Sequence, residues 1–153
     1  MLHTLLERSA VIAAGVVLAA STLFGSTAAS ADPPTNLSSA ADTLRAASQC
    51  PPLQPNPLVT RAAEMATNET SDYIAHRTAV VPFTDPVPAL NTIGYPTGKA
   101  LLFTGYDPNE ADSIQGLTLT MRKDIRDCTL TQYGTSTRHE DGFVLTAAVL
   151  TTP

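Results

Sequence analysis

Residues 129–152 read TLTQYGTSTRHEDGFVLTAAVLTT, and this stretch decides the fold. Two runs rich in strand-forming residues, 129–137 and 143–152, flank the polar sequence Arg138–Gly142, which contains an Asp-Gly turn signal. The second run is apolar at both alternating sets of positions, as expected for a strand that is covered on both faces. The stretch therefore predicts an antiparallel hairpin whose second strand lies inside a sheet.

Two helices are predicted before this hairpin, over residues 38–48 and 57–75. In both segments, small and apolar residues recur at helical spacing. The second helix has the clearer start, because Asn56 is a good N-cap and Pro57 suits the first helical position. Its apolar stripe is rich in alanine, which predicts close packing against a neighbouring element.

The segment between the second helix and the hairpin is less regular. Residues 77–98 are rich in proline, show neither helical nor strand periodicity, and are predicted to form an ordered surface loop. The short apolar run 100–103 is compatible with a strand or with a buried turn. A third helix is predicted over 108–124, because Asp107 is a capping residue that is followed by a proline and then by a glutamate three positions on. Helices followed by a terminal hairpin indicate an α+β layered domain.

Composition and charge exclude two classes of partner. The chain has 153 residues, with 14 acidic and 9 basic side chains and a net charge of -5. Its basic residues form no run, whereas binding to nucleic acid or to an anionic membrane surface needs a basic patch. With 43% apolar residues, the chain can bury a core. We expect one small domain, monomeric, with no nucleic-acid partner and no membrane span.

The first 31 residues have the features of a cleaved secretory signal peptide. Arg8 precedes the uninterrupted run of small and apolar residues 10–20, and Ala29-Ser30-Ala31 matches the pattern that signal peptidase accepts. The alternative, a transmembrane anchor, needs about 20 strongly apolar residues, which is longer than this run. The residue after the cleavage point is Asp32 and not the cysteine that a lipid anchor needs, so the protein is expected to be extracellular without such an anchor. The predicted organisation is a signal peptide over 1–31, a flexible lead over 32–37 and a single domain over 38–153.

Cys50 and Cys128 are the two cysteines of the chain. Outside the cytosol, two thiols in one small domain usually oxidise, so a Cys50–Cys128 disulfide is predicted. The alternative is a reactive thiol, but neither cysteine has a Cys-x-x-Cys context or a neighbouring histidine that would lower its pKa.

Motifs for catalysis or cofactor binding are absent from the sequence. There is no P-loop, no Gly-x-Gly-x-x-Gly, no Gly-x-Ser-x-Gly and no His-Glu-x-x-His, so no cofactor is expected. Two histidines follow the predicted signal peptide. His139 is expected in the hairpin turn, exposed to solvent, and His76 at the end of the long helix, where the helix dipole favours an imidazolium. The weak catalytic candidates are His76 together with Glu64, Glu69 or Glu110.

Several short segments occur in a recognisable order along the chain. They are Ile74-Ala75-His76 at a helix end, Gly94-Tyr95, Gly105, Glu110-Ala111 at a helix start, and Ile125-Arg126-Asp127-Cys128 followed by Tyr133-Gly134-Thr135-Ser136 and an apolar last strand. In this order they resemble the CAP superfamily, which comprises cysteine-rich secretory, antigen 5 and pathogenesis-related-1 proteins. The resemblance covers residues 40–151 and is strongest to the short secreted members of actinobacteria. It implies an α-β-α sandwich with the hairpin in a central antiparallel sheet.

The resemblance also implies a metal site, from which this chain departs. CAP proteins with an intact cleft bind a divalent ion through two histidines and acidic residues, and His76 matches the first histidine. In Gly98-Lys99-Ala100-Leu101, however, Lys99 stands where the family has an acidic residue, and a lysine would repel a cation. Residues 115–125 contain no second histidine. We therefore expect a degenerate CAP-like domain that holds no metal.

These expectations converge on a secreted, non-enzymatic binding module. Because some CAP proteins bind sterols or other lipids, the resemblance implies a lipid, another hydrophobic small molecule or a protein as the partner. The proline-rich loop 77–98, with Phe83, is the expected contact region. One alternative is an envelope or extracellular interaction protein without a pocket, and another is a hydrolase that uses His76.

Overall fold

The computed structural model describes residues 36–153, which form an α+β fold. The predicted signal peptide, 1–31, and most of the predicted lead, 32–37, lie outside the described residues. The elements follow in the order α1 (Leu37–Ala46), β1 (Gln54–Pro55), α2 (Pro57–Ile74), α3 (Val87–Thr92), β2 (Ala100–Asp107), α4 (Glu110–Met121), the 3₁₀ helix η1 (Asp124–Arg126), β3 (Gln132–Glu140) and β4 (Phe143–Thr151). In this part of the chain, no helix is both long and apolar enough to cross a membrane.

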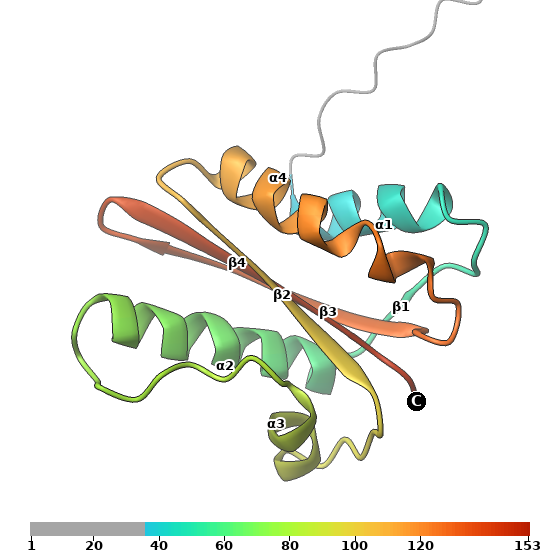
Figure 1. Ribbon diagram of the computed structural model, residues 1–153, viewed down its shortest axis with the longest axis horizontal. Coiled ribbons are helices and arrows are strands. Elements are labelled where there is room, and N and C mark those ends of the chain that lie inside the picture. Colours follow the sequence, from blue (N-terminus) through green and yellow to red (C-terminus); the bar gives the residue numbers. More distant parts are fainter. Residues whose placement is uncertain (1–35) are drawn as a thin grey trace, which may run out of the picture. The chain divides into compact units, whose positions relative to one another are not determined.

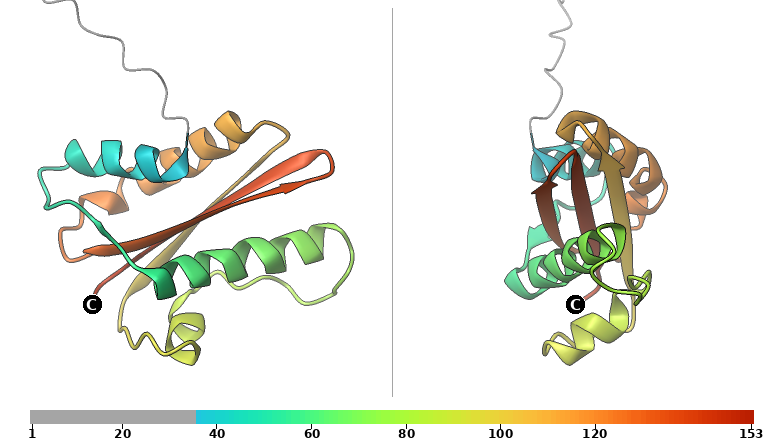
Figure 2. Two further views of the ribbon diagram at one scale, coloured as in Figure 1. Left: turned by 180° about the vertical axis from the view of Figure 1, so that it is seen from behind. Right: turned by 90° about the vertical axis from the view of Figure 1, so that its left-hand side faces the viewer.

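The four strands form one sheet between two layers of helices. The strand order is β1-β3-β4-β2, with β4 antiparallel to both of its neighbours and β1 parallel to β3. Helices α1 and α4 lie on one face of the sheet, and α2 lies on the other (Figures 1 and 2). The layered α+β architecture predicted from the sequence is confirmed.

The predicted hairpin is formed by β3 and β4, with the Asp141-Gly142 turn between them. Gly142 has a φ of +83°, a backbone conformation that a glycine adopts without strain. As predicted, β4 is a central strand that is buried on both faces. Its side chains at 147 and 149 pack with α2, and those at 148 and 150 pack with α1 and α4.

Three local predictions differ from the structure. The loop predicted over 77–98 contains a helix, α3. This helix is only six residues long, which is too few turns for helical periodicity to be recognised in the sequence. Helix α4 begins at Glu110 and is capped by Asn109, whose side chain accepts the Ala111 N–H; Asp107 instead accepts the Asn109 N–H. His139 was expected in the turn but lies within β3, because the hydrogen-bonded ladder continues to Glu140.

The predicted disulfide joins Cys50 to Cys128, whose Cα atoms are 5.2 Å apart. Next to it, the side chain of Arg45 enters the core from the end of α1 and is only 1% exposed. Its guanidinium donates hydrogen bonds of 2.7–3.0 Å to backbone carbonyls on both sides of the disulfide. The acceptors are the carbonyl oxygens of Pro51, Ile125, Asp127 and Leu130. Burial lowers the pKa of Arg45, and the charge of Asp127 offsets part of this effect.

Close packing of α2 on the sheet depends on Gly134 of β3. A Cβ atom at this position would lie 2.1 Å from the backbone nitrogen of Thr60 and 2.3 Å from the carbonyl carbon of Val59. Both atoms belong to the backbone of α2, so no side-chain rotation can relieve the clash. The alanine-rich face of α2, with Ala62, Ala63 and Ala66 buried, continues this close contact along the helix.

We therefore expect Gly134→Ala to lower the free energy of unfolding by about 3 kcal/mol, because α2 must move away from the sheet. The matched control is Gly116→Ala in α4, where a Cβ atom meets nothing within 4 Å. That change is expected to raise stability by about 1 kcal/mol through helix propensity. Urea unfolding of both variants measures the difference, and equal stabilities would contradict the packing account.

Candidate functional site

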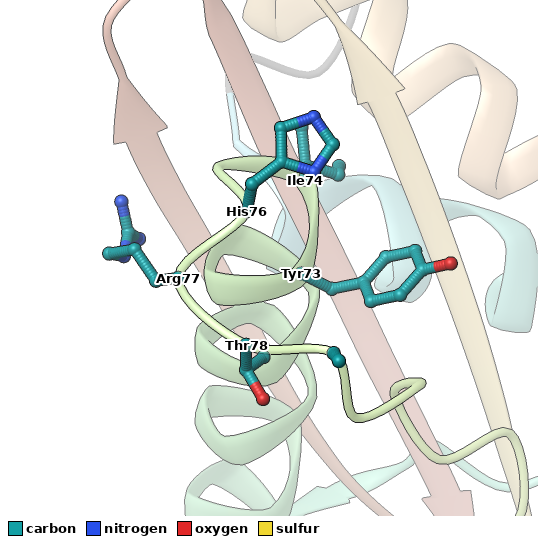
Figure 3. A pocket seen from close by; sticks show the side chains of 6 residues that line it. Tyr73, Ile74, His76, Arg77 and Thr78 are labelled. Carbon is teal, nitrogen blue, oxygen red and sulfur yellow. The ribbon is translucent and has the colours of Figure 1, made fainter.

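The end of α2 carries His76, the histidine that the sequence analysis selected as a candidate. The helix ends at Ile74, and His76 follows with a φ of +55°, in the left-handed region. Its backbone N–H donates to the Tyr73 carbonyl and closes the helix end. An open hollow of about 560 Å³ is lined here by Tyr73, Ile74, His76, Arg77, Thr78 and Ala79. In Figure 3 the labelled side chains radiate from the turn and do not converge on one point.

A charged cluster lies between the end of α2 and β3. Ser71, which is fully buried, donates a 2.5 Å hydrogen bond to Glu140, and Arg138 donates to the same carboxylate. These hydrogen bonds, with Ser71 the largest contributor, lower the pKa of Glu140. Arg77 completes the cluster by donating to Ser71 and to Asp72. Ser71 is thus a buried donor to a carboxylate, and this arrangement ties α2 to β3.

The candidate acidic residues are not gathered around His76. Glu110, at the start of α4, lies 3.2 Å from the Nε2 atom of His139, on the face of the sheet opposite to α2. Glu69 accepts the backbone N–H of Phe83 at 3.4 Å and so holds the loop after α2. Glu64 is exposed on α2. The pairing of Glu110 with His139 was not foreseen, because 29 residues separate them and only the fold brings β3 and α4 together.

The residues present do not fit the divalent ion that the family resemblance implies. Within residues 36–153, no three His, Cys, Asp or Glu side chains come close enough to hold a metal ion. His76 follows α2, whereas His139 belongs to the α4 face of the sheet and pairs there with Glu110. Lys99, at the position where the family has an acidic residue, forms an ion pair with Asp127. This contact is the main cause of the lowered pKa of Asp127.

An apolar groove lies under the loop that joins α2 to α3. It has a volume of about 390 Å³ and is lined by side chains of α2, of the loop and of α3. Val80 and Val81 are 70% and 69% exposed, the highest values among the large apolar side chains of the described residues. Its other lining residues are Met65, Phe83, Pro88 and Ala89, together with Glu69, Asp85 and Thr92.

A second hollow lies next to this groove, beside strand β2. Its volume is about 270 Å³, and Val81 and Phe83 line both hollows. On the far side it reaches Leu102 and Thr104 of β2. This loop and Phe83 are the contact region predicted from the sequence, but Val80 and Val81 were not singled out, although an apolar pair within a proline-rich loop is a signal that the sequence contains.

The backbone of His76 suggests a direct test of its role. A non-glycine residue in the left-handed region costs about 1 kcal/mol relative to glycine. If the side chain of His76 makes no essential contact, His76→Gly will raise the free energy of unfolding by about that amount. Gln49, whose φ is +64°, is the matched control, and Gln49→Gly is expected to give a similar gain. A loss of stability in His76→Gly alone, measured by urea unfolding, would show that the imidazole contributes a contact of its own.

Comparison with known proteins supports the fold only. No protein-family model matches the chain, and no curated protein matches it. An outer surface protein from Borrelia burgdorferi is similar in structure, with a TM-score of 0.59 at 10% identity over 76% of this chain and 89% of that one. A cysteine-rich secretory protein from Staphylococcus aureus has a TM-score of 0.52 at 14% identity over 76% of this chain.

This chain matches only 37% of the length of the staphylococcal protein. An extracellular protein with an SCP domain from Bacillus anthracis is 14% identical over 74% of this chain and 38% of that one, and its TM-score of 0.47 is too low to add to the comparison. The two stronger likenesses agree with the layered α+β architecture. The chain therefore has a CAP-like fold, shared with an outer surface protein and with a secretory protein.

Proposed function

We propose that this chain is a secreted, non-enzymatic module that binds a hydrophobic ligand in the groove under the α2–α3 loop. The observation that carries the proposal is the exposure of Val80 and Val81 beside that groove. Burial of a valine side chain stabilises a protein or complex by about 1.5–3 kcal/mol relative to leaving that side chain exposed to water. Two adjacent valines at the rim of an apolar groove are therefore well placed to close over an apolar ligand.

The size and lining of the groove support a small apolar ligand. Ligand sites are concave, mostly apolar and typically about 300–1,000 Å³ in volume. The groove falls in this range, and Met65, Phe83 and Pro88 are among its apolar lining residues. The hollow beside Leu102 shares Val81 and Phe83 with the groove, and the two together are the proposed site for an elongated molecule such as an acyl chain.

The polar groups of the groove serve the loop itself. Glu69 accepts the Phe83 N–H, Asp85 accepts the Val87 N–H, and the Thr92 hydroxyl donates to the Pro88 carbonyl. No histidine, serine or cysteine lines the groove, so the arrangement includes no nucleophile paired with a base. This lining supports binding without catalysis and without a metal.

Binding of a neutral apolar fluorophore, N-phenyl-1-naphthylamine, tests the proposal. We expect Val81→Ser to weaken binding about tenfold, because the lost methyl groups no longer contact the probe. The matched control is Leu119→Ser in α4, since Leu119 is 56% exposed and lies outside the groove. This control is expected to bind like the wild-type protein.

Two results of this titration would contradict the proposal. Equal affinity of the wild-type protein and Val81→Ser would place the binding site elsewhere. Failure of the wild-type protein to bind the probe, together with capture of a protein through Val80 and Val81 in a pull-down, would favour the alternative of an interaction protein that does not use the groove. Hydrolysis of an ester substrate that is lost in His76→Ala would favour the hydrolase.

A further inference from the structure

We propose that two copies of this chain associate through strand β2 and join their sheets into one continuous antiparallel sheet. The proposal does not depend on the groove described above. It departs from the monomer that the sequence analysis expects, and it rests on the free edge of the sheet, on the composition of β2 and on the register in which β2 can pair with itself.

Strand β2 is the last strand of the sheet, and among the described residues no further strand pairs with its outer edge, which the α2–α3 loop approaches at Leu102 and Thr104. In Figure 1, β2 crosses the front of the molecule, and no other helix or strand lies in front of it. The Thr152 N–H donates to the Lys99 carbonyl, so these two residues form a hydrogen-bonded pair at the start of the β2–β4 ladder. Because such pairs alternate in an antiparallel ladder, the N–H and C=O groups of the even-numbered residues of β2 point away from the sheet.

These outward residues are Ala100, Leu102, Thr104 and Tyr106. In the described part of the chain, their outward backbone groups have no other backbone partner. Strand β2 also lacks the usual protection of an edge. It contains no proline and no lysine, its only charged residue is the terminal Asp107, and its eight residues pair with β4 one to one without a bulge.

The opposite edge of the sheet, formed by β1 and β3, is protected against pairing with a further strand, unlike the edge formed by β2. There, the short strand β1 covers the first two residues of β3 and contains Pro55. Beyond β1, strand β3 carries Arg138, His139 and Glu140, whose charges oppose pairing with a further strand. The fold thus blocks one edge with charges and proline and leaves the other edge regular and largely apolar.

The register of self-pairing follows from the positions of the charges. If two β2 strands pair antiparallel about a two-fold axis at Phe103, each Lys99 lies opposite the Asp107 of the second copy. In the same register, Ala100 faces Tyr106 and Leu102 faces Thr104, so every outward residue meets an outward residue. All the free backbone groups can then pair, and Tyr106, which is 57% exposed, gains a small neighbour in Ala100. The strand is complementary to a second copy of itself in hydrogen bonding, and Lys99, which pairs with Asp127 within its own copy, gains a second carboxylate in the Asp107 of the partner copy.

Sedimentation equilibrium of the purified, oxidised protein tests the proposal with Thr104→Pro. Proline removes an N–H that points outward, so the ladder to β4 keeps its hydrogen bonds while each copy loses one across the dimer. We expect the dimer Kd to rise about 100-fold. Thr104→Ala, which keeps the N–H, is the matched control and is expected to dimerise like the wild-type protein.

A charge exchange provides a second test that does not depend on proline. Lys99→Asp and Asp107→Lys are each expected to raise the dimer Kd about tenfold, because like charges then face each other. The double variant restores opposite charges and is expected to return to within about threefold of the wild-type Kd. A wild-type protein that stays monomeric up to about 1 mM, or a dimer that is unaffected by both sets of variants, would overturn the proposal.

Discussion

Arg45→Met is expected to lower the free energy of unfolding by about 5 kcal/mol, the largest effect that we predict for a single substitution. The guanidinium of Arg45 satisfies four backbone carbonyls, of which those of Ile125 and Leu130 are buried and those of Pro51 and Asp127 are partly buried, and methionine fills a similar volume without any donor. Each buried acceptor that is left unpaired costs about 1–3 kcal/mol, and local relaxation with entry of water recovers part of the total. Urea unfolding monitored by circular dichroism measures the loss.

Arg61→Met is the matched control, because Arg61 is exposed on α2. We expect this control to change stability by less than about 0.5 kcal/mol. An intermediate loss is expected for Arg45→Lys, since an ammonium group has only three donors and cannot reproduce the planar fork. A loss below about 2 kcal/mol in Arg45→Met would contradict the role assigned to this side chain.

Removal of the disulfide has the second largest expected effect. The bond joins residues separated by 78 positions. In the chain-entropy treatment, closing a loop of this length stabilises the folded state by about 4 kcal/mol. The double variant Cys50→Ser, Cys128→Ser is therefore expected to lose about that amount, and the wild-type protein is expected to lose a similar amount when it is reduced.

The disulfide and Arg45 hold the same part of the molecule, so a variant that lacks both provides a control for the stability measurements. Both connect the end of α1 to the segment around η1 and Leu130. Combining Arg45→Met with the two serines is expected to lower the free energy of unfolding by less than the sum of the separate losses. The reason is that both changes release the same region, so the second change removes little that the first has left intact. Full additivity, or a loss below about 1 kcal/mol on removal of the disulfide alone, would contradict this account.

The features that sequence reasoning predicted correctly have strong local signals. The hairpin combines a two-residue turn with alternating polarity, and α2 combines an Asn56 cap with Pro57 at the first helical position. The disulfide followed from the presence of only two cysteines in a chain expected to be secreted. In each case, a few neighbouring residues or a simple count contain the information.

The features that were missed depend on contacts that no local pattern encodes. Strand β1 has only two residues and exists because it pairs with Gln132 and Tyr133 of β3. At the start of α4, Asp107 and Asn109 are both competent caps, and only the backbone path selects Asn109. Element boundaries of this kind are set by tertiary structure.

In the candidate site too, some features have a local sequence signal and others depend on tertiary structure. That the loop after α2 is the contact region stays a prediction; what the structure adds is a groove lined by residues of that loop. The exposure of Val80 and Val81 could not be read from the sequence, because an apolar pair in a loop is equally compatible with burial. His76 illustrates the reverse case, since its place at the helix end was predicted but its left-handed backbone was not.

Native mass spectrometry of protein collected from the medium of cells that express the full chain tests the central claim most directly. One spectrum reports the mature mass, the state of the two cysteines and any retained ligand. The account predicts a species that begins at Asp32, lacks the two thiol protons and carries an apolar adduct that is lost in Val81→Ser. A species without any adduct from repeated preparations, which also fails to take up added lipid, would contradict the claim that this CAP-like module binds a hydrophobic ligand.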